Sequence, residues 1–203
     1  MKLYFSKGAC SLVCRIIINE LGLTAEYEAV DLAKKTTASG ENFLGINPKG
    51  SVPVLITNDN QTLTENAVIL QYLADTNKAE KLLPFMGNFK RYRVLETLNF
   101  ITTELHKGFG PLFNKEVPEE VKEKIFIPII KKKFAYVNSQ LELNKYLCGE
   151  EFTLPDAYLF VMVTWTRFFN IDLKEFPQLS QYFSELQSRK SIQKSLSEEG
   201  IKI

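Results

Sequence analysis

The chain has 203 residues, 45% of them hydrophobic and 24% charged, a composition that excludes an intrinsically disordered protein. Its 25 basic side chains balance 24 acidic ones, and the resulting net charge of +1 disfavours a dedicated nucleic-acid-binding protein. No apolar run approaches the ~18 residues of a membrane span, and no signal peptide follows Met1, so we expect a cytoplasmic protein without a membrane partner.

Cysteine and histidine limit the available chemistry. The three cysteines are an odd number without a secretory signal, which predicts free thiols in a reducing compartment. His106 is the single histidine, so a multi-histidine metal site within one chain is excluded, and we expect no metal.

The first part of the chain alternates between strand and helix patterns. The expected elements are a strand at residues 2–5, a helix at 10–21, strands at 26–32, 52–57 and 61–64, and a helix at 65–75. Asn58-Asp59-Asn60 predicts a hairpin turn between the last two strands, and Thr64 is placed to cap the helix that follows. The order β-α-β, an irregular link and β-β-α predicts a small mixed sheet with helices packed on it.

The remainder of the chain has helical patterns. Helices are expected at residues 88–107, 119–143, 154–169 and 178–188, with a short one before Gly200. Pro128 predicts a kink in the second of these, and the sequence from Thr153 to Asp156 predicts a capping box at the start of the third. The change near Pro84 indicates two domains, an α/β domain at 1–80 and an all-α domain at 88–203.

Cys10 is the first candidate for chemistry. It follows a Ser-Lys-Gly-Ala loop and opens a helix, where backbone N–H groups and the helix dipole stabilise a thiolate. The alternative is a small buried side chain without chemistry, and the position alone does not decide between the two. Cys14 follows in a C-x-x-x-C spacing, not the C-x-x-C of a dithiol centre, so Cys14 and Cys148 are interpreted as structural.

A polar stripe marks the helix expected at 88–107. Asn99, Thr103 and His106 are spaced to share one face of a helix that is otherwise apolar. An amide, a hydroxyl and an imidazole on one face can line a cleft. The alternative, which the spacing alone favours, is a solvated face with a cation near the helix C-terminus.

Glu65 begins the helix expected at 65–75. A carboxylate there complements the helix dipole without any further role. It can also bind a cation while neighbouring backbone N–H groups bind an anion, a combination that suits the zwitterionic head group of an amino acid.

Six motifs occur in an order that is specific in combination. They are Gly-Ala-Cys-Ser-Leu at 8–12, Asn-Pro-Lys-Gly-Ser-Val-Pro at 47–53, Thr-Glu at 64–65, Gln-Tyr-Leu-Ala-Asp at 71–75, Thr-Glu-Leu-His-Lys-Gly at 103–108 and Phe-Thr-Leu-Pro-Asp-Ala-Tyr at 152–158. In this combination the chain resembles the bacterial beta-class glutathione S-transferases over essentially its whole length. The resemblance implies a thioredoxin-like N-terminal α/β domain, an all-helical C-terminal domain and a homodimer, which together are the glutathione transferase fold.

The resemblance also implies a glutathione site between the domains, with no cofactor besides this co-substrate. Its expected residues are Cys10, Lys35, Val52, Glu65, Asn66, Asn99, Thr103, Glu104, Leu105 and His106, with Cys10 and His106 catalytic and some of the helical residues reaching across the dimer. By likeness, the peptide bond between Val52 and Pro53 is cis, and the Val52 backbone pairs with the peptide part of glutathione. Glu65 and the Asn66 amide hold the γ-glutamyl head group, and Lys35 reaches a carboxylate.

The chain departs from the family pattern at two positions. Asn66 stands where relatives often have Ser or Gly, so only its backbone contact carries over. Arg15 stands where close relatives often have His, which leaves His106 as the single imidazole. The sequence assigns no Tyr or Ser as the thiol activator that other classes use, and Tyr4 and Ser11 are nearby candidates.

The predicted function is a detoxifying transferase that conjugates the glutathione thiolate to small hydrophobic electrophiles. Its apolar pocket is expected near Phe109, Phe113, Trp165 and Phe169. A first alternative is glutathione-dependent thiol-disulfide exchange or peroxidase chemistry through Cys10 itself. A second is a non-catalytic ligand-binding protein on the same fold.

Overall fold

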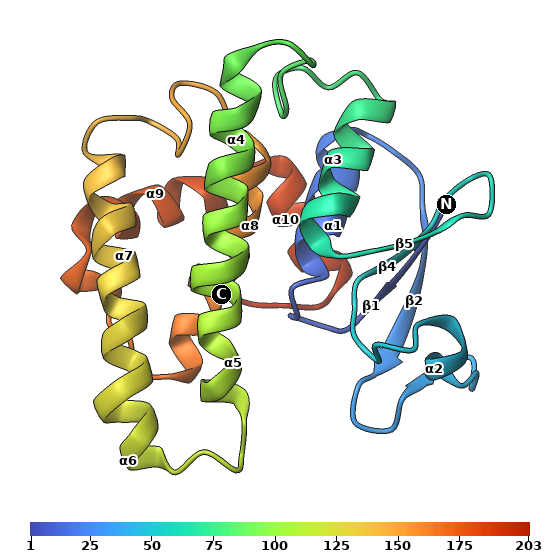
Figure 1. Cartoon of the computed structure of the whole chain (residues 1–203), viewed down its shortest axis with the longest axis horizontal. Coiled ribbons are helices and arrows are strands. Elements are labelled where there is room, and N and C mark those ends of the chain that lie inside the picture. Colours follow the sequence, from blue (N-terminus) through green and yellow to red (C-terminus); the bar gives the residue numbers. More distant parts are fainter. The chain divides into compact units, whose positions relative to one another are not determined.

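The computed structural model describes all residues from 1 to 203, and they form two compact units. Unit 1 comprises Met1–Ala79 and Arg189–Ile203, and unit 2 comprises Glu80–Ser188. The C-terminal segment therefore groups with the first unit, whereas the expected second domain extended from 88 to 203. The physical reason is that α10 (Lys190–Glu198) packs along α1 (Leu12–Glu20), as Figure 1 shows.

Unit 1 is built on a five-stranded sheet in the order β3-β2-β1-β4-β5. Its strands are β1 (Lys2–Phe5), β2 (Glu26–Asp31), β3 (Thr36–Thr37), β4 (Val54–Ile56) and β5 (Thr62–Thr64). β1 pairs in parallel with β2 and antiparallel with β4, so the sheet is mixed, as predicted. Leu3 lies opposite Tyr27 on one side and Leu55 on the other, which places it in the centre of the core.

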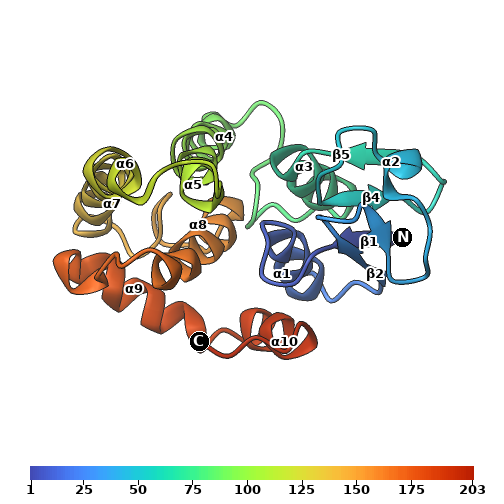
Figure 2. The same ribbon diagram turned by 90° about the horizontal axis from the view of Figure 1, so that it is seen from below.

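Helices cover both faces of this sheet. α1 and α3 (Asn66–Thr76) lie on one face and the short α2 (Phe43–Ile46) lies on the other, as seen in Figure 2. Phe43 of α2 packs in a buried cluster with Tyr4 and Val54 of the sheet. An irregular link was predicted for this stretch, because elements of two and four residues are too short to show a periodicity.

Unit 2 is all-helical. Its α-helices are α4 (Phe89–Phe100), α5 (Lys107–Phe113), α6 (Glu119–Val121), α7 (Ile127–Leu141), α8 (Leu154–Thr164) and α9 (Pro177–Gln187). α8 is buried at every position, which its almost uninterrupted apolar sequence requires. The predicted capping box is confirmed, since the Asp156 carboxylate accepts from the Thr153 N–H and hydroxyl, each at 2.7 Å. None of the helices combines the length and the apolar character that crossing a bilayer demands.

Two π-helical turns interrupt the helices of unit 2. Ile101–His106 joins α4 to α5, and Lys122–Phe126 joins α6 to α7. The second turn falls just before Pro128, where an interruption was predicted because proline has no N–H to donate to the preceding turn. The first turn was not predicted, and the helical path continues through it to Phe113, beyond the expected end at residue 107.

Candidate functional site

Cys10 lies in the turn that leads from β1 into α1. Its side chain is only 8% exposed, and Sγ donates to the carbonyl oxygen of Val52 at 3.4 Å. The peptide bond between Val52 and Pro53 is cis, as the resemblance implied. The fold therefore brings two of the predicted residues, 42 positions apart in sequence, into contact.

Glu65 occupies the N-cap of α3 in an unusual backbone conformation. Its φ of 71° lies in the left-handed region that residues with side chains rarely adopt. The predicted cap was wrong, because Thr64 ends β5 and Glu65 takes the cap position. The Glu65 carboxylate is 61% exposed and pairs with Lys49 Nζ at 2.6 Å.

The side chain of Asn66 joins the starts of two helices. It is buried at the beginning of α3, and Nδ2 donates to the Cys10 carbonyl oxygen at 2.8 Å. Oδ1 accepts from Cys14 Sγ of α1 at 3.0 Å. Burial, with a smaller effect of Cys10, raises the pKa of the Cys14 thiol well above its usual value, so Cys14 is a neutral donor. Nothing in the sequence pointed to this link, because its members are far apart in the chain.

Lys35 is tethered to the segment that leads to Val52. Its Nζ donates to the Gly50 carbonyl at 2.7 Å. Gly50 has a φ of +62°, and a Cβ there would lie 3.3 Å from the Lys35 side chain and 3.2 Å from Leu44. Glycine is therefore the residue that lets the lysine lie across this turn.

The unit 2 candidates lie on α4 and on the π turn that follows it. Asn99 is an exposed residue near the end of α4, and the other four are in the turn, namely Thr103, Glu104, Leu105 and His106. The N–H of Lys107 bonds to the carbonyl of Thr102, five residues back, so the side-chain spacing of an α-helix does not hold here. π turns are frequent at functional sites.

Three of these residues have different surroundings from one another. The Thr103 hydroxyl donates to the Asn99 carbonyl at 3.1 Å, and Glu104 pairs with Lys133 of α7. The Leu105 side chain is fully buried, so it packs in the core of unit 2 and only its backbone is left to meet a ligand.

The His106 ring is held by aromatic side chains. Its Nδ1 lies 2.7 Å from the hydroxyl of Tyr158, a fully buried residue of α8. Its centroid lies 5.5 Å from that of Trp165 at 62°. α8 therefore fixes the orientation of the imidazole. Tyr158 belongs to the motif at 152–158 but was not among the residues predicted for the site.

The four aromatic residues expected around an apolar pocket do lie together. Phe113 is 5.1 Å from Trp165 and 4.7 Å from Phe169, centroid to centroid. Phe109 is 5.6 Å from Trp165 and is completely buried, whereas Phe113 is half exposed. Trp165 contacts His106 as well, so the cluster continues to the imidazole.

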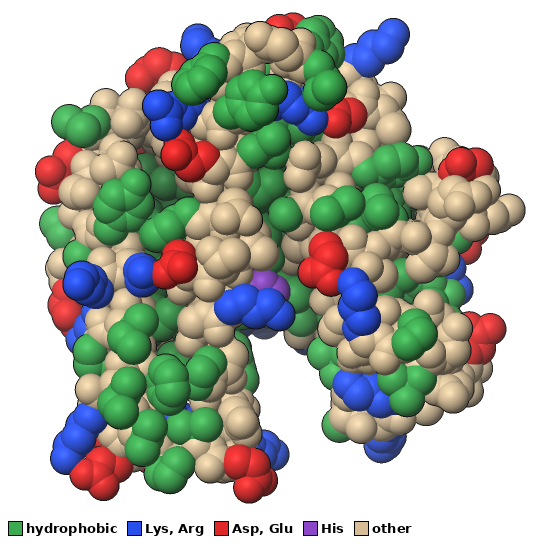
Figure 3. Space-filling model, viewed as in Figure 1, with side chains coloured by type: hydrophobic (Ala, Val, Ile, Leu, Met, Phe, Trp, Pro, Cys, Tyr) green, Lys and Arg blue, Asp and Glu red, His purple; other side chains and the backbone are tan.

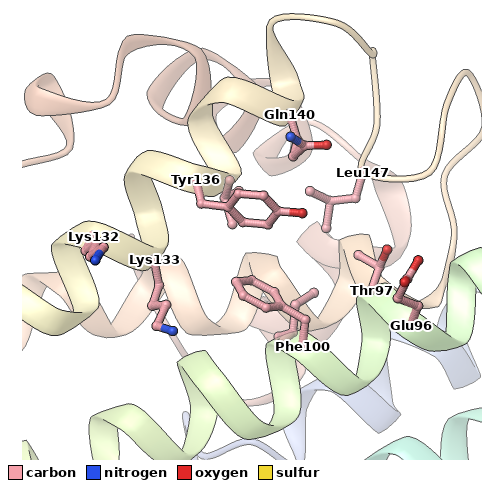
Figure 4. A pocket seen from close by; sticks show the side chains of 10 residues that line it. Glu96, Thr97, Phe100, Lys132, Lys133, Tyr136, Gln140 and Leu147 are labelled. Carbon is pink, nitrogen blue, oxygen red and sulfur yellow. The ribbon is translucent and has the colours of Figure 1, made fainter.

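A separate groove of about 370 Å³ lies between α4 and α7, as Figure 4 shows. Its walls include Phe100, Tyr136 and Leu147, and Figure 3 shows further hydrophobic side chains on the surface of these helices. The groove contains none of the residues predicted for the glutathione or electrophile site. No cluster of three or more His, Cys, Asp or Glu side chains is placed to hold a metal ion.

Comparison with known proteins agrees with this architecture. Family models of the glutathione S-transferase N-terminal and C-terminal domains match residues 8–76 and 100–190. The chain is 40% identical, over 202 residues and the full length of both sequences, to the glutathione S-transferase GstA of Escherichia coli O157:H7.

Solved structures give the same result. A beta-class glutathione S-transferase of Sphingomonas chungbukensis matches at a TM-score of 0.95 and 37% identity, covering 100% of both chains. A ternary complex of the bacterial enzyme BphK matches at a TM-score of 0.95 and 43% identity, covering 99% of this chain and 100% of the other. These matches confirm the predicted fold class and the resemblance that the motifs indicated. The chain belongs to the glutathione S-transferase family.

Proposed function

We propose that the protein is a glutathione transferase that joins the glutathione thiolate to small hydrophobic electrophiles. The observation that carries this proposal is the cluster in unit 1, where Cys10, Val52, Glu65 and Asn66 lie together. A sphingomonad glutathione S-transferase, 39% identical with a TM-score of 0.95, has been solved in complex with glutathione.

The start of α3 suits the γ-glutamyl head group. The N–H groups of Val68 and Ile69 both bond to the Glu65 carbonyl, so the first two N–H groups of the helix, of Asn66 and Ala67, have no partner within it. In our proposal these two amides bind the head-group carboxylate and the Glu65 carboxylate binds its ammonium. The Val52 backbone then pairs with the peptide part, and Lys35 reaches the far carboxylate.

Activation of the glutathione thiol needs more than one group. A thiol of pKa near ~8.5 is only slightly ionised at neutral pH, and lowering it by about two units corresponds to roughly 2.7 kcal/mol. One helix terminus supplies at most ~2 kcal/mol. We propose that His106, oriented by Tyr158, contributes the remainder together with the polar groups of Asn99, Thr103 and Glu104. The sulfur then bonds to the electrophilic carbon as its leaving group departs.

The aromatic cluster is the proposed place for the electrophile. Phe113, Trp165 and Phe169 present apolar rings beside the His106 imidazole, and Phe109 supports them from below the surface. Apolar and aromatic lining with a few polar groups is the usual composition of a small-molecule site.

A conjugation assay tests the proposal. The purified protein is mixed with glutathione and a chlorodinitrobenzene, and formation of the thioether, with loss of chloride, is followed. We expect a rate that saturates in glutathione and vanishes when glutathione is replaced by its S-methyl derivative. Tight glutathione binding without turnover of a panel of electrophiles would instead establish a non-catalytic ligand-binding protein.

The alternative chemistry uses the Cys10 thiol itself. The Cys10 side chain is 8% exposed and its thiol bonds to the Val52 carbonyl. Both observations favour a Cys10 that lines the site over a Cys10 that attacks large disulfide substrates. Cys10→Ala separates the two activities. Conjugation that persists while disulfide reduction disappears would make Cys10 a redox centre and remove it from the conjugation mechanism.

We also propose a homodimer in the cytoplasm. The resemblance supports the dimer, and the three free cysteines suit a reducing compartment. Light scattering should give twice the chain mass of 23.3 kDa. Fractionation of cells that express the protein at its native level tests the location.

A further inference from the structure

Asn66 is the one side chain that bonds to both the Cys10 backbone and the Cys14 thiol of α1. Its Nδ2 donates to the Cys10 carbonyl oxygen at 2.8 Å, and its Oδ1 accepts from the Cys14 thiol at 3.0 Å. The same residue is the first of α3, directly after Glu65. A single buried amide therefore connects the start of α3, proposed for the head group, to Cys10 and the start of α1.

We propose that the Asn66 side chain is a positioning residue, and that the buried thiol of Cys14 holds its amide in the required orientation. This inference rests on the proposed function. Asn66 then acts on the reaction through Cys10 and the start of α1, apart from any contact that its backbone makes with a ligand.

The Cys14 thiol is the part of the link that decides which way the amide faces. A thiol donates a hydrogen bond, so it faces the carbonyl oxygen of the amide and leaves the NH₂ group toward Cys10. The reversed amide would set its oxygen against the Cys10 carbonyl oxygen and its NH₂ against the thiol hydrogen. Cys14 is fully buried, so water does not reach Asn66 Oδ1 to replace the thiol as a hydrogen-bond donor.

The link acts at the point where Cys10 enters the helix. The Cys10 carbonyl oxygen accepts a hydrogen bond from the Asn66 amide and a second one from the Val13 N–H at 3.1 Å. These two hydrogen bonds fix the plane of the peptide group that follows Cys10, and hence the direction in which the Cys10 side chain points. A misplacement of about 1 Å in a site can cost on the order of a hundredfold in rate.

The experiment compares variants of the full-length protein in conjugation of glutathione with a chlorodinitrobenzene. Asn66→Ala removes the link, Cys14→Ala removes the group that orients it, and Cys14→Ser keeps a donor of similar size. Asn19→Ala is the matched control, because Asn19 lies at the other end of α1 and bonds to Ser195 and Glu198. Thermal midpoints are recorded for all variants.

We expect Asn66→Ala to lower kcat about tenfold or more and to move the pH–rate profile to higher pH, while KM for glutathione changes less than about threefold. Glu65 and the amides of α3 remain in place, which is why binding is retained. Cys14→Ala should lower kcat by a smaller factor, and Cys14→Ser should restore it. The double variant should be no slower than Asn66→Ala, since both changes break one link.

A readout that needs no turnover accompanies these rates. In a Cys148→Ser background, iodoacetamide reports on Cys10, because Cys14 is inaccessible. We expect alkylation to become at least about threefold faster in Asn66→Ala, whose loop is no longer held, and to stay unchanged in Asn19→Ala.

Two results would overturn the inference. One is an Asn66→Ala protein that resembles Asn19→Ala in kcat, pH profile and alkylation, and differs from wild type only in thermal midpoint. The other is a Cys14→Ser protein as slow as Cys14→Ala, a comparison that remains available if Asn66→Ala fails to fold. A wild-type protein without conjugating activity would defeat the proposed function, and the alkylation rates would still decide on the link.

Discussion

At the scale of single residues, Glu65 combines a strained backbone with an exposed charge. Left-handed φ values cost free energy, and such strain is concentrated at binding sites. The ion pair with Lys49 does not explain why Glu65 keeps this strained backbone, because exposed ion pairs contribute only about 0–1 kcal/mol to stability. The proposed role of Glu65, to bind the ammonium of the ligand, would account for both the strained backbone and the exposed charge.

The first prediction concerns this carboxylate. Glu65→Gln should weaken glutathione binding about tenfold or more, because a hydrogen bond to a charged group contributes about 1.5–3 kcal/mol. Lys49→Met, which removes the ion pair and leaves the carboxylate, should change the dissociation constant less than about threefold. Calorimetric titration measures both. Equal losses in the two variants would mean that the pair, and not the carboxylate, binds the ligand.

Several site residues could be selected from local sequence alone. Cys10 and Glu65 stand at expected helix starts, and His106 is the sole imidazole, so position and scarcity point to them. The partners of these residues could not be selected. Asn66 was expected only for its backbone amide. The side-chain contacts of Asn66 and Tyr158 join residues 52 or more positions apart, which only the tertiary fold brings together.

At the scale of elements, the long helical patterns were predictable and the irregular turns were not. The helix of 15 residues at Ile127–Leu141 and the interruption before it follow from periodicity and Pro128. The π turn at Ile101–His106 contains no proline or glycine, and its i to i+5 bond leaves no local sequence signal. It nevertheless decides where four of the candidate residues point.

The second prediction concerns the start of α8. Asp156 accepts hydrogen bonds from Thr153, from the Leu147 N–H at 2.9 Å and from the Tyr182 hydroxyl at 2.5 Å. Asp156→Ala should lower the free energy of unfolding by about 3 kcal/mol or more, because it removes a cap and leaves buried donors without a partner. Asp172→Ala, which removes an exposed cap bonded to the Lys174 N–H, should cost about 0.5–2 kcal/mol in the same urea titration. Equal costs would contradict this account.

The third prediction concerns pH and the junction of α1 with α10. Burial favours a higher pKa for Glu20, but hydrogen bonds from Arg189 and Ser191 outweigh it and hold the pKa below the usual 4.5. A lowered pKa contributes stability that is present above 4.5 and is lost as the pH falls through the folded value. Glu20→Gln should therefore lower the thermal midpoint near neutral pH, and the difference from wild type should shrink below about pH 4.

Glu26→Gln is the control for this pH series. Glu26 lies on the exposed side of β2, so its replacement should leave the midpoint unchanged across the range. A Glu20→Gln difference that stays constant from neutral to acidic pH would show that the carboxylate charge is not what stabilises the junction.

At the scale of the whole molecule, the two ends of the chain form one unit. Arg15 of α1 is buried between the rings of Phe5 and Tyr27, and its Nε bonds to Glu199 at 3.0 Å. The same carboxylate accepts from the Gly8 N–H at 2.9 Å. The sequence showed a short final helix but not its partner, because an ion pair between residues 184 positions apart leaves no local pattern.

The fourth prediction follows from this arrangement. A chain that ends at Ser188 loses Ile192 and Leu196, both buried, and with them about 3–6 kcal/mol at 1.5–3 kcal/mol each. Chemical denaturation should show the loss in unit 1, where α1 becomes exposed. Removal of Ile203 alone, which is exposed, is the control and should have no measurable effect. An unchanged free energy in the longer truncation would contradict the division into units.

The family comparisons confirm the predicted enzyme class, and the central claim left to test is that the protein keeps the sulfur of bound glutathione ionised. The most direct measurement is a titration with glutathione at neutral pH, followed by calorimetry and by the ultraviolet absorbance of thiolate. We expect saturable binding with a thiolate signal that grows in proportion to occupancy. No binding at millimolar glutathione, or binding with the thiol still protonated, would contradict it.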